Sequence, residues 1–404
     1  MTQGFFSKKE IESSSRPDGK VYSCTSCGLL KNSINPMMKP SGEFKKGILI
    51  VLDSPSKTEG ESNIPLSDKA GRKIKTVLKQ FGIDVYEDCL ITYALRCNPD
   101  SRKGSLTYEI SCCRRFLLKT IEEFQPKLIL AFGESAVFSI IGHRWKKDFG
   151  TIQKWRGWVI PDQDLKTWIC PVYDAQFVLH REEEVSTIWN QDIQRAISYV
   201  NKPLKKWKHP NVKIISDLSF LEKITSGPIA IDYETTGLKP HAEGHRIICI
   251  SVAYSPDDAY VFLMPSRKER QPFLNLLTNP RIGKLAQNIK FEDSWTVSRL
   301  KTQIIGWEWD SMLAAHILDN REGITGLKFQ TYVRFGIIDY SSEIEAYLQG
   351  KDPKNSNSLN RVDELISTKS GQEKLLNYCA MDTIVQYRLS MLQIKEMNYT
   401  FLPF

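Results

Sequence analysis

No run of apolar residues in this chain of 404 residues approaches the roughly 20 that a bilayer-spanning helix needs. The first twenty residues, MTQGFFSKKEIESSSRPDGK, are polar and lack the apolar stretch and cleavage site of a signal peptide. The sequence also has no internal repeat. These absences predict a cytoplasmic protein that does not enter a membrane, whose nine cysteines are reduced or bind metal.

The chain has little excess charge of either sign. It contains 55 Lys and Arg against 47 Asp and Glu, which gives a net charge of +8. A mildly basic protein can bind a polyanion, but a basic surface without any special partner fits the same number. Charge alone therefore leaves both alternatives open.

The pattern of apolar residues divides the chain into two parts. Up to about residue 200, strand-like runs such as GILIVLD alternate with helical patterns, which predicts an α/β fold with helices on both faces of a parallel sheet. Closely spaced strands then predict hairpins and a mixed sheet, followed after Met264 by mostly helical sequence. The basic, proline-bearing segment NKPLKKWKHPNV between them predicts a linker. We predict a first domain at 1–200, a linker at 201–212 and a second domain at 213–404.

Two acids, Asp232 and Glu234, stand at the end of the apolar run PIAIDYE. Residues two apart in a strand point to the same side, so both carboxylates face one surface. Burying two anions side by side costs several kcal/mol unless something positive lies between them. The pair by itself is a weak signal, because most such pairs are solvated surface acids.

Two later segments offer further polar groups. KLAQNIKFED contains Asn288, Glu292 and Asp293, and LLNYCAMD contains Tyr378 and Asp382 four residues apart on one face of a helix. Taken singly, the acids fit a helix surface and the tyrosine fits a core. Their combination with the first pair predicts one converging site.

These segments resemble the three motifs of the DEDDy 3′→5′ exonucleases, in particular the proofreading domain of family A DNA polymerases. IDYETTGL matches the first motif, AQNIKFE the second and YCAMD the third, and the resemblance covers about residues 205–400. It implies an RNase H-like fold with a mixed sheet and hydrolysis of single-stranded 3′ ends. It further implies that four carboxylates hold two Mg²⁺ or Mn²⁺ ions, that Tyr378 orients the attacking water and that Asn288 supports the second motif. The four are Asp232, Glu234, Glu292 and Asp382.

The second motif departs from the family pattern. The family has aspartate four residues after the asparagine, and this chain has Glu292 there. Glutamate can still bind a metal ion, one methylene further out. Asp293 is the alternative ligand, although neighbouring residues on a helix point about 100° apart. We predict that Glu292 is the ligand, and the substitution leaves room for reduced activity.

The cysteines of the first half follow a different pattern. Cys24 and Cys27 form a C-x₂-C pair, and Cys97 and Cys113 follow in ALRCNP and EISCCRRFL. With these segments, residues 20–195 resemble the family 4 iron–sulfur uracil-DNA glycosylases, which implies an α/β/α sandwich and a [4Fe–4S] cluster held by those four thiols. The resemblance leaves Cys112 as a buried thiol. Four unconnected core cysteines remain the alternative.

The catalytic motifs of that family are degenerate in this chain. Asp53 occupies the position of the motif's glutamate, in LDSPS, and Leu66 occupies that of the aromatic residue that stacks on uracil. Tyr93 stands where an asparagine pairs with the uracil edge, and Asp174 stands where a histidine stabilises the developing anion. A carboxylate there would oppose a negatively charged leaving base. We predict a domain that has lost uracil excision and binds DNA, docks a partner or is purely structural.

The combined prediction is a metal-dependent 3′→5′ DNA exonuclease for proofreading or end trimming, fused to a glycosylase-like module. The resemblance brings to mind phage DNA replication, and thus the host cytoplasm, with a separately encoded DNA polymerase as partner or a longer polymerase of which this chain is a piece. The apolar tail Tyr399–Phe404 is either a docking peptide or packs on its own domain. Two other functions stay open: an active uracil or modified-base glycosylase, and a non-catalytic DNA-binding scaffold.

Overall fold

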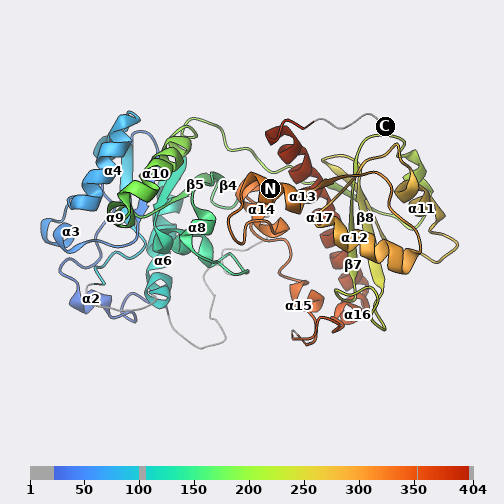
Figure 1. The fold of residues 1–404 in the computed structure, drawn as a ribbon. Coiled ribbons are helices and arrows are strands. Elements are labelled where there is room, and N and C mark those ends of the chain that lie inside the picture. Colours follow the sequence, from blue (N-terminus) through green and yellow to red (C-terminus); the bar gives the residue numbers. More distant parts are fainter. Residues whose placement is uncertain (1–21, 100–105, 353, 400–404) are drawn as a thin grey trace. The chain divides into compact units, whose positions relative to one another are not determined.

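The computed structural model describes residues 22–99, 106–352 and 354–399 (Figure 1). Within these residues no helix combines the length and the apolar character that crossing a bilayer requires. Most of the predicted tail lies outside the described residues. Tyr399 is the last residue described, and its ring centre lies 5.2 Å from that of Trp309.

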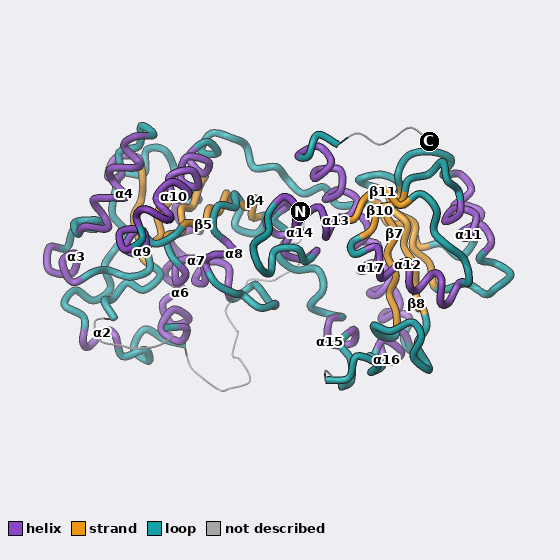
Figure 2. The backbone as a smooth tube through the Cα atoms, in the orientation of Figure 1, coloured by secondary structure: helices purple, strands orange, loops and turns teal. Residues whose placement is uncertain are grey.

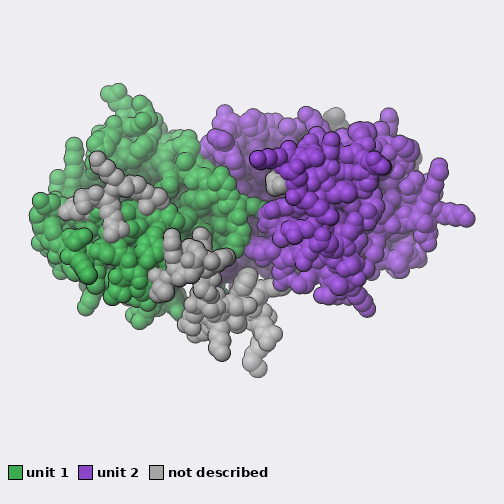
Figure 3. Space-filling model, turned by 90° about the horizontal axis from the view of Figure 1, so that it is seen from below, with its two compact units in different colours: residues 1–159, 165–204 green, residues 160–164, 205–404 purple. Residues whose placement is uncertain are grey.

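The chain forms two compact units, which Figure 3 shows in green and purple. The first comprises residues 1–159 and 165–204, and the second comprises residues 160–164 and 205–404. Each half of the chain has its own sheet.

The sheet of the first half has five strands in the order β2-β1-β3-β5-β4. β1 pairs with β2 and β3 in parallel, and β3 pairs with β5 in parallel, so the predicted parallel sheet is confirmed. The strand β4 was not predicted, because three residues are too few to show a periodicity. The strands are β1 (Ile48–Leu52), β2 (Cys89–Tyr93), β3 (Leu128–Phe132), β4 (Ile160–Asp162) and β5 (Thr167–Val172).

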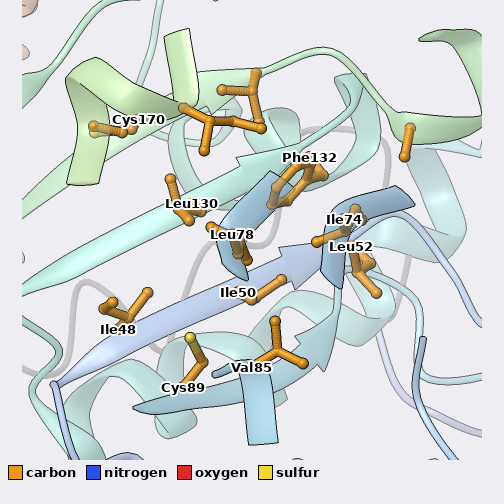
Figure 4. Close-up of a cluster of buried hydrophobic side chains, with 14 of the residues drawn as sticks. Ile48, Ile50, Leu52, Ile74, Leu78, Val85, Cys89, Leu130, Phe132 and Cys170 are labelled. Carbon is orange, nitrogen blue, oxygen red and sulfur yellow. The ribbon is translucent and has the colours of Figure 1, made fainter. Parts of the chain in front are cut away.

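Helices connect and cover these strands (Figure 2). The helix α4 begins where Asp68 accepts a hydrogen bond from the amide of Gly71 at 2.7 Å, and it buries Ile74 and Leu78 against alternate residues of the strands (Figure 4). The elements are α2 (Leu29–Asn32), α3 (Lys57–Ser62), α4 (Lys69–Gln80), α5 (Val85–Asp88), α6 (Thr107–Phe124), α7 (Glu134–Val137), η1 (Phe138–Gly142), α8 (Ile152–Trp155), α9 (Ala175–His180) and α10 (Glu182–Ile197).

The sheet of the second half has six strands in the order β11-β10-β7-β8-β9-β6. β7, β8 and β9 are antiparallel neighbours, whereas β10, β11 and β6 join in parallel, which confirms the predicted mixed sheet. The expectation of mostly helical sequence after Met264 was incomplete, because β10 and β11 are short strands within it. The strands are β6 (Asn211–Ile214), β7 (Ile229–Thr235), β8 (Ile247–Ala253), β9 (Asp258–Leu263), β10 (Lys284–Ala286) and β11 (Trp307–Asp310).

The helix α17 has 28 residues and packs on β7, β8 and β9. It begins where the hydroxyl of Thr368 accepts a hydrogen bond from the amide of Gly371 at 3.0 Å. Because one rigid helix lies across three strands, it fixes its polar residues relative to them. The other elements are η2 (Leu218–Lys223), α11 (Gln271–Thr278), α12 (Ile289–Trp295), η3 (Thr296–Leu300), α13 (Ser311–Leu318), α14 (Leu327–Phe335), α15 (Glu345–Leu348) and α16 (Val362–Ile366), before α17 (Lys369–Glu396).

Candidate functional site

The strand β7 carries the first two acids, Asp232 and Glu234, on the side that faces α17. A carboxylate oxygen of each and the sulfur of Cys379 all lie within 4.8 Å of one another. The thiol of Cys379 donates a hydrogen bond to Asp232 Oδ2 at 3.6 Å. Burial raises the pKa of this thiol well above its ordinary value, which keeps the donor proton in place.

A buried hydroxyl fixes α17 over the strands. Ser251 of β8 lies opposite Asp232 in the sheet register, and its hydroxyl donates to the carbonyl of Cys379 at 2.9 Å. The same hydroxyl contacts Thr383 one turn further along the helix. Tyr378 and Asp382 therefore project from a helix whose position relative to β7 is defined by hydrogen bonds.

A turn after β10 places the third acid. Asn288 adopts a left-handed conformation, with φ 69°, and α12 starts directly after it. The carboxylate of Asp310, at the end of β11, accepts hydrogen bonds from the amides of Asn288 at 3.0 Å and Ile289 at 2.9 Å. Asp310 also caps α13 by accepting from the amide of Met312 at 2.9 Å. Asp310 thus fixes the start of the helix that carries Glu292.

Glu292 and Asp293 have different surroundings. The side chain of Glu292 is 2% exposed, and its Oε2 finds no hydrogen-bond partner among the described residues. Asp293 is partly exposed, and its Oδ1 accepts a hydrogen bond from the indole of Trp307 at 3.3 Å. A buried carboxylate oxygen without a partner is costly unless a cation binds it, so the surroundings favour Glu292 over Asp293 as a metal ligand.

The fourth acid, Asp382, is held by a lysine. The ammonium group of Lys328 on α14 forms an ion pair with Asp382 Oδ1. It also lies 3.7 Å from the ring centre of Tyr340 and 4.2 Å from that of Tyr378. Sequence reasoning identified neither Lys328 nor Tyr340 as part of the site.

The acids of the site raise one another's pKa. Burial raises the pKa of Asp232 to about 7, and the charge of Asp382 adds to the rise while Lys328 opposes it. Burial raises the pKa of Glu234 and of Glu292 well above the ordinary value, and the charge of Asp232 adds to both rises. Such a cluster binds protons or cations in preference to remaining fully charged.

The donor set fits hard divalent cations. Carboxylate oxygens from β7, α12 and α17 are the ligands that Mg²⁺ and Mn²⁺ prefer, and the orphaned oxygen of Glu292 is available to bind one. Burial raises the pKa of the Tyr378 phenol well above its ordinary value, so the hydroxyl keeps its proton at neutral pH. It can orient a water molecule as a hydrogen-bond partner, but it is not a base.

A pair of variants tests which neighbouring acid is the ligand. We expect Glu292→Gln to lower metal-dependent hydrolysis by about 10²-fold or more, because a neutral amide replaces a charged ligand. Asp293→Asn should change the rate by less than about threefold, because the new side chain can still accept from Trp307. Initial rates on single-stranded DNA measure both, and the opposite order of effects would assign the ligand to Asp293.

The four cysteines predicted to bind a cluster border one cavity in the first unit. Cys24, Cys27, Cys97 and Cys113 line this small cavity together with Cys112. C-x₂-C precedes α2, the third cysteine follows β2, and the last two belong to α6.

Backbone amides point at two of these sulfurs. The amide of Met37 donates to Cys97 at 3.4 Å, and the amide of Arg96 donates to Cys113 at 3.4 Å. Such bonds stabilise thiolates and their metal complexes. Because soft sulfur donors surround an apolar cavity, the residues fit an iron–sulfur cluster.

The residues at the degenerate glycosylase positions form hydrogen bonds within the protein. Tyr93 is fully buried, and its hydroxyl donates to Glu59 Oε1 at 3.0 Å. The same oxygen accepts from the amide of Leu66 at 2.6 Å, and Glu59 Oε2 accepts from the amide of Ser56 at 2.7 Å. Leu66 has φ 58°, and a Cβ on Gly71 would lie 2.2 Å from the Leu66 Cα, so this turn requires glycine there.

Asp53 and Asp174 are bound to helix N-termini. Asp53 Oδ1 accepts from the amide of Ala136 at 2.8 Å, and burial, with Asp174 as a further cause, raises the Asp53 pKa to about 7. Asp174 caps α9 by accepting from the amides of Gln176 at 3.0 Å and Phe177 at 3.3 Å. Both carboxylates thus accept hydrogen bonds from backbone amides, and Asp174 is not placed to stabilise a developing anion as a histidine would.

Comparison with known families agrees with this division. Residues 40–194 match the family described as the uracil DNA glycosylase superfamily, and residues 212–393 match the family described as 3′-5′ exonuclease. The chain joins a glycosylase-like half to an exonuclease-like half. Each match lies in its own half of the chain, with the UDG-like fold in the first half and the RNase H-like exonuclease fold in the second.

Individual relatives show the same split. The type-4 uracil-DNA glycosylase of Thermotoga maritima is 28% identical over 184 residues, which are 45% of this chain and 92% of that protein. The corresponding enzyme of Archaeoglobus fulgidus is 26% identical over 41% of this chain and 82% of its own length. DNA polymerase I of Chloroflexus aurantiacus is 30% identical over 133 residues, which are 30% of this chain and 14% of the polymerase.

Among solved structures, Escherichia coli RNase D, described as an exoribonuclease involved in structured RNA processing, aligns with a TM-score of 0.35 at 14% identity. The alignment covers 46% of this chain and 45% of RNase D.

Proposed function

We propose that the second unit is a two-metal 3′→5′ exonuclease that removes nucleotides from single-stranded DNA ends. The observation that carries this proposal is the gathering of buried acids from three distant segments around Asp232, one of them with an orphaned oxygen. The match of residues 212–393 to an exonuclease family supports it.

In this proposal the acids Asp232, Glu234, Glu292 and Asp382 hold two Mg²⁺ or Mn²⁺ ions. When bound, such ions supply a reactive water and neutralise charge on the attacking and departing oxygens. Tyr378 orients the water through its protonated hydroxyl, and Cys379 keeps Asp232 in place by donating to it. Asn288 and Asp310 fix the helix that presents Glu292.

Digestion of 5′-labelled single-stranded DNA tests the proposal. With Mg²⁺ we expect a ladder of products shortened from the 3′ end and release of nucleoside monophosphates, and with EDTA we expect none. A matched RNA oligonucleotide, run in parallel, tests the preference for DNA. No ladder at any divalent metal concentration would leave the scaffold alternative.

For the first unit we propose DNA binding without uracil excision. Three hydrogen bonds occupy the two oxygens of Glu59, and through them Tyr93 and Leu66 fill positions where a base would be recognised. A flipped base needs an open pocket with hydrogen-bond partners for its edge.

Incubation with uracil-containing duplexes, followed by alkali, should therefore give no strand cleavage above background. Tyr93→Asn should not restore it, because Asp174 still caps α9 where a histidine would be needed. Cleavage by the unchanged protein at uracil or a modified base would support the glycosylase alternative instead.

We also propose a role in DNA replication. An exonuclease of this type would serve a DNA polymerase, either a separate subunit or a longer chain of which this sequence is a piece, in phage-type replication in the cytoplasm. Binding to a cognate polymerase, measured by co-purification and by a change in its error rate, tests this partnership.

A further inference from the structure

An ammonium group stands among the acids of the site although no motif predicts a cation there. Lys328 belongs to α14, and its side chain is 19% exposed, while that of its partner Asp382 is 11% exposed. An ion pair so far removed from water is stronger than a surface pair, because less solvent screens it.

Two aromatic rings surround the same ammonium group. The ring centres of Tyr340 and Tyr378 lie 3.7 Å and 4.2 Å from Lys328 Nζ, within the range of cation–π attraction. The rings lie 6.1 Å apart, tilted by 35°. They can hold the ammonium group in the site independently of the carboxylate.

The electrostatic effect of Lys328 extends beyond its partner. Its charge opposes the repulsion felt by both Asp232 and Glu234 on β7. The lysine thus neutralises part of the same negative charge that a divalent cation would neutralise. It also occupies one oxygen, Oδ1, of Asp382, a carboxylate that the proposed function assigns to the metal.

We propose that Lys328 is the resident counter-ion of the metal-free site, and that it competes with a divalent cation for Asp382. This inference rests on the proposed exonuclease function. If a metal ion bound the carboxylate, the ammonium group could stay against the two tyrosine rings. Lys328 therefore stabilises the metal-free protein and weakens metal binding, whereas a lysine that merely orients Asp382 as a ligand would strengthen metal binding.

Calorimetric titration of the full chain with Mn²⁺, at fixed pH and salt, distinguishes these opposite effects. Lys328→Met should bind Mn²⁺ about tenfold more tightly than the unchanged protein, because Mn²⁺ no longer has to displace an ion pair from Asp382. Its melting temperature should fall in EDTA, and the difference should vanish with saturating Mn²⁺. Lys328→Arg keeps the charge and should stay within about threefold of the unchanged affinity.

Lys374→Met is the matched control, because Lys374 forms an ion pair with Glu343 in which the side chains are 50% and 68% exposed. It should alter neither Mn²⁺ affinity nor the melting temperature in EDTA by a measurable amount. Melting in saturating Mn²⁺ confirms that each variant is folded.

Equal or weaker Mn²⁺ binding by Lys328→Met overturns the inference. If the unchanged protein nevertheless binds Mn²⁺ and digests DNA, the exonuclease proposal survives and only the role of Lys328 is wrong. If the unchanged protein neither binds Mn²⁺ nor digests DNA, both proposals fail together.

Discussion

Asp232→Asn is expected to lower the rate of 3′-end hydrolysis by at least about 10³-fold, which corresponds to losing about 4 kcal/mol of transition-state stabilisation. The reason is that Asp232 lies at the centre of the acids, within 4.8 Å of Glu234 and close enough to Glu292 to raise its pKa. Initial rates on 5′-labelled single-stranded DNA at saturating Mg²⁺ measure the effect.

Asp217→Asn is the control for this experiment, since Asp217 is exposed and caps η2 by accepting from the amide of Ser219 at 2.9 Å. Asparagine can make the same bond, so activity should be unchanged. A rate for Asp232→Asn within tenfold of the original would contradict the two-metal assignment.

The same substitution should have the opposite effect on stability without metal. Asp232 loses its proton near pH 4 when unfolded but near pH 7 when folded, because burial and Asp382 raise its pKa. Stability therefore falls as pH rises through this interval, and the penalty is complete above pH 7. Removing the charge should raise the free energy of unfolding in EDTA by about 1–2 kcal/mol at pH 8. The gain is no larger because Asp232 is partly exposed, so water screens its charge.

Denaturation in EDTA measures this difference, which should shrink as the pH is lowered toward 4. A variant less stable than the original at pH 8 would mean that the negative charge of Asp232 is compensated within the protein. Mg²⁺ should stabilise the original protein more than the variant, because binding only to the folded state adds to its stability.

Cys97→Ser is expected to abolish an absorbance band at about 400 nm, the expected sign of an iron–sulfur cluster. Cys97 lines the cavity and accepts a hydrogen bond from the amide of Met37, and burial raises the pKa of its thiol. Because cluster binding is coupled to folding, the first unit should lose about 3 kcal/mol or more of stability. Absorbance spectra, iron analysis and denaturation of protein purified without oxygen provide the measurements.

Cys112→Ser is the matched control, because Cys112 borders the same cavity and is 1% exposed. The variant should keep the band, and its free energy of unfolding should fall by only about 1–2 kcal/mol, because a hydroxyl is buried in place of a thiol. If Cys112→Ser loses the band while Cys113→Ser retains it, the fourth ligand is Cys112. If all these variants match the unchanged protein, the cysteines are ordinary core residues.

The sequence predicted the elements whose pattern is local. Parallel strands in the first half and the antiparallel group in the second were visible because their apolar runs are long enough to show a period. The short strands β10 and β11 were not, and β10 leads directly into the left-handed turn at Asn288. Three or four residues carry no periodicity, and their pairing depends on neighbours far away in the chain.

The same limit applies to the candidate site. Asp232, Glu234, Glu292 and Asp382 belong to motifs with recognisable spacing, but Lys328 meets Asp382 across 54 positions. Cys379 was not identified from the sequence, because an apolar thiol next to Tyr378 fits a core position. Its spacing of three from Asp382 was the available signal, since residues three apart lie on one face of a helix. Glu59 gave no signal beyond a capping box, because its bond to Tyr93, 34 positions away, is set by tertiary packing.

The length of α17 has a consequence for how this protein can change over evolution. One helix presents Tyr378 and Asp382 to the site and also buries apolar residues such as Leu375 and Ile384 in the core. Inserting or deleting a single residue would rotate everything beyond it by about 100°. A one-residue insertion or deletion between Leu375 and Ile384 would therefore move candidate site residues and core residues out of register together.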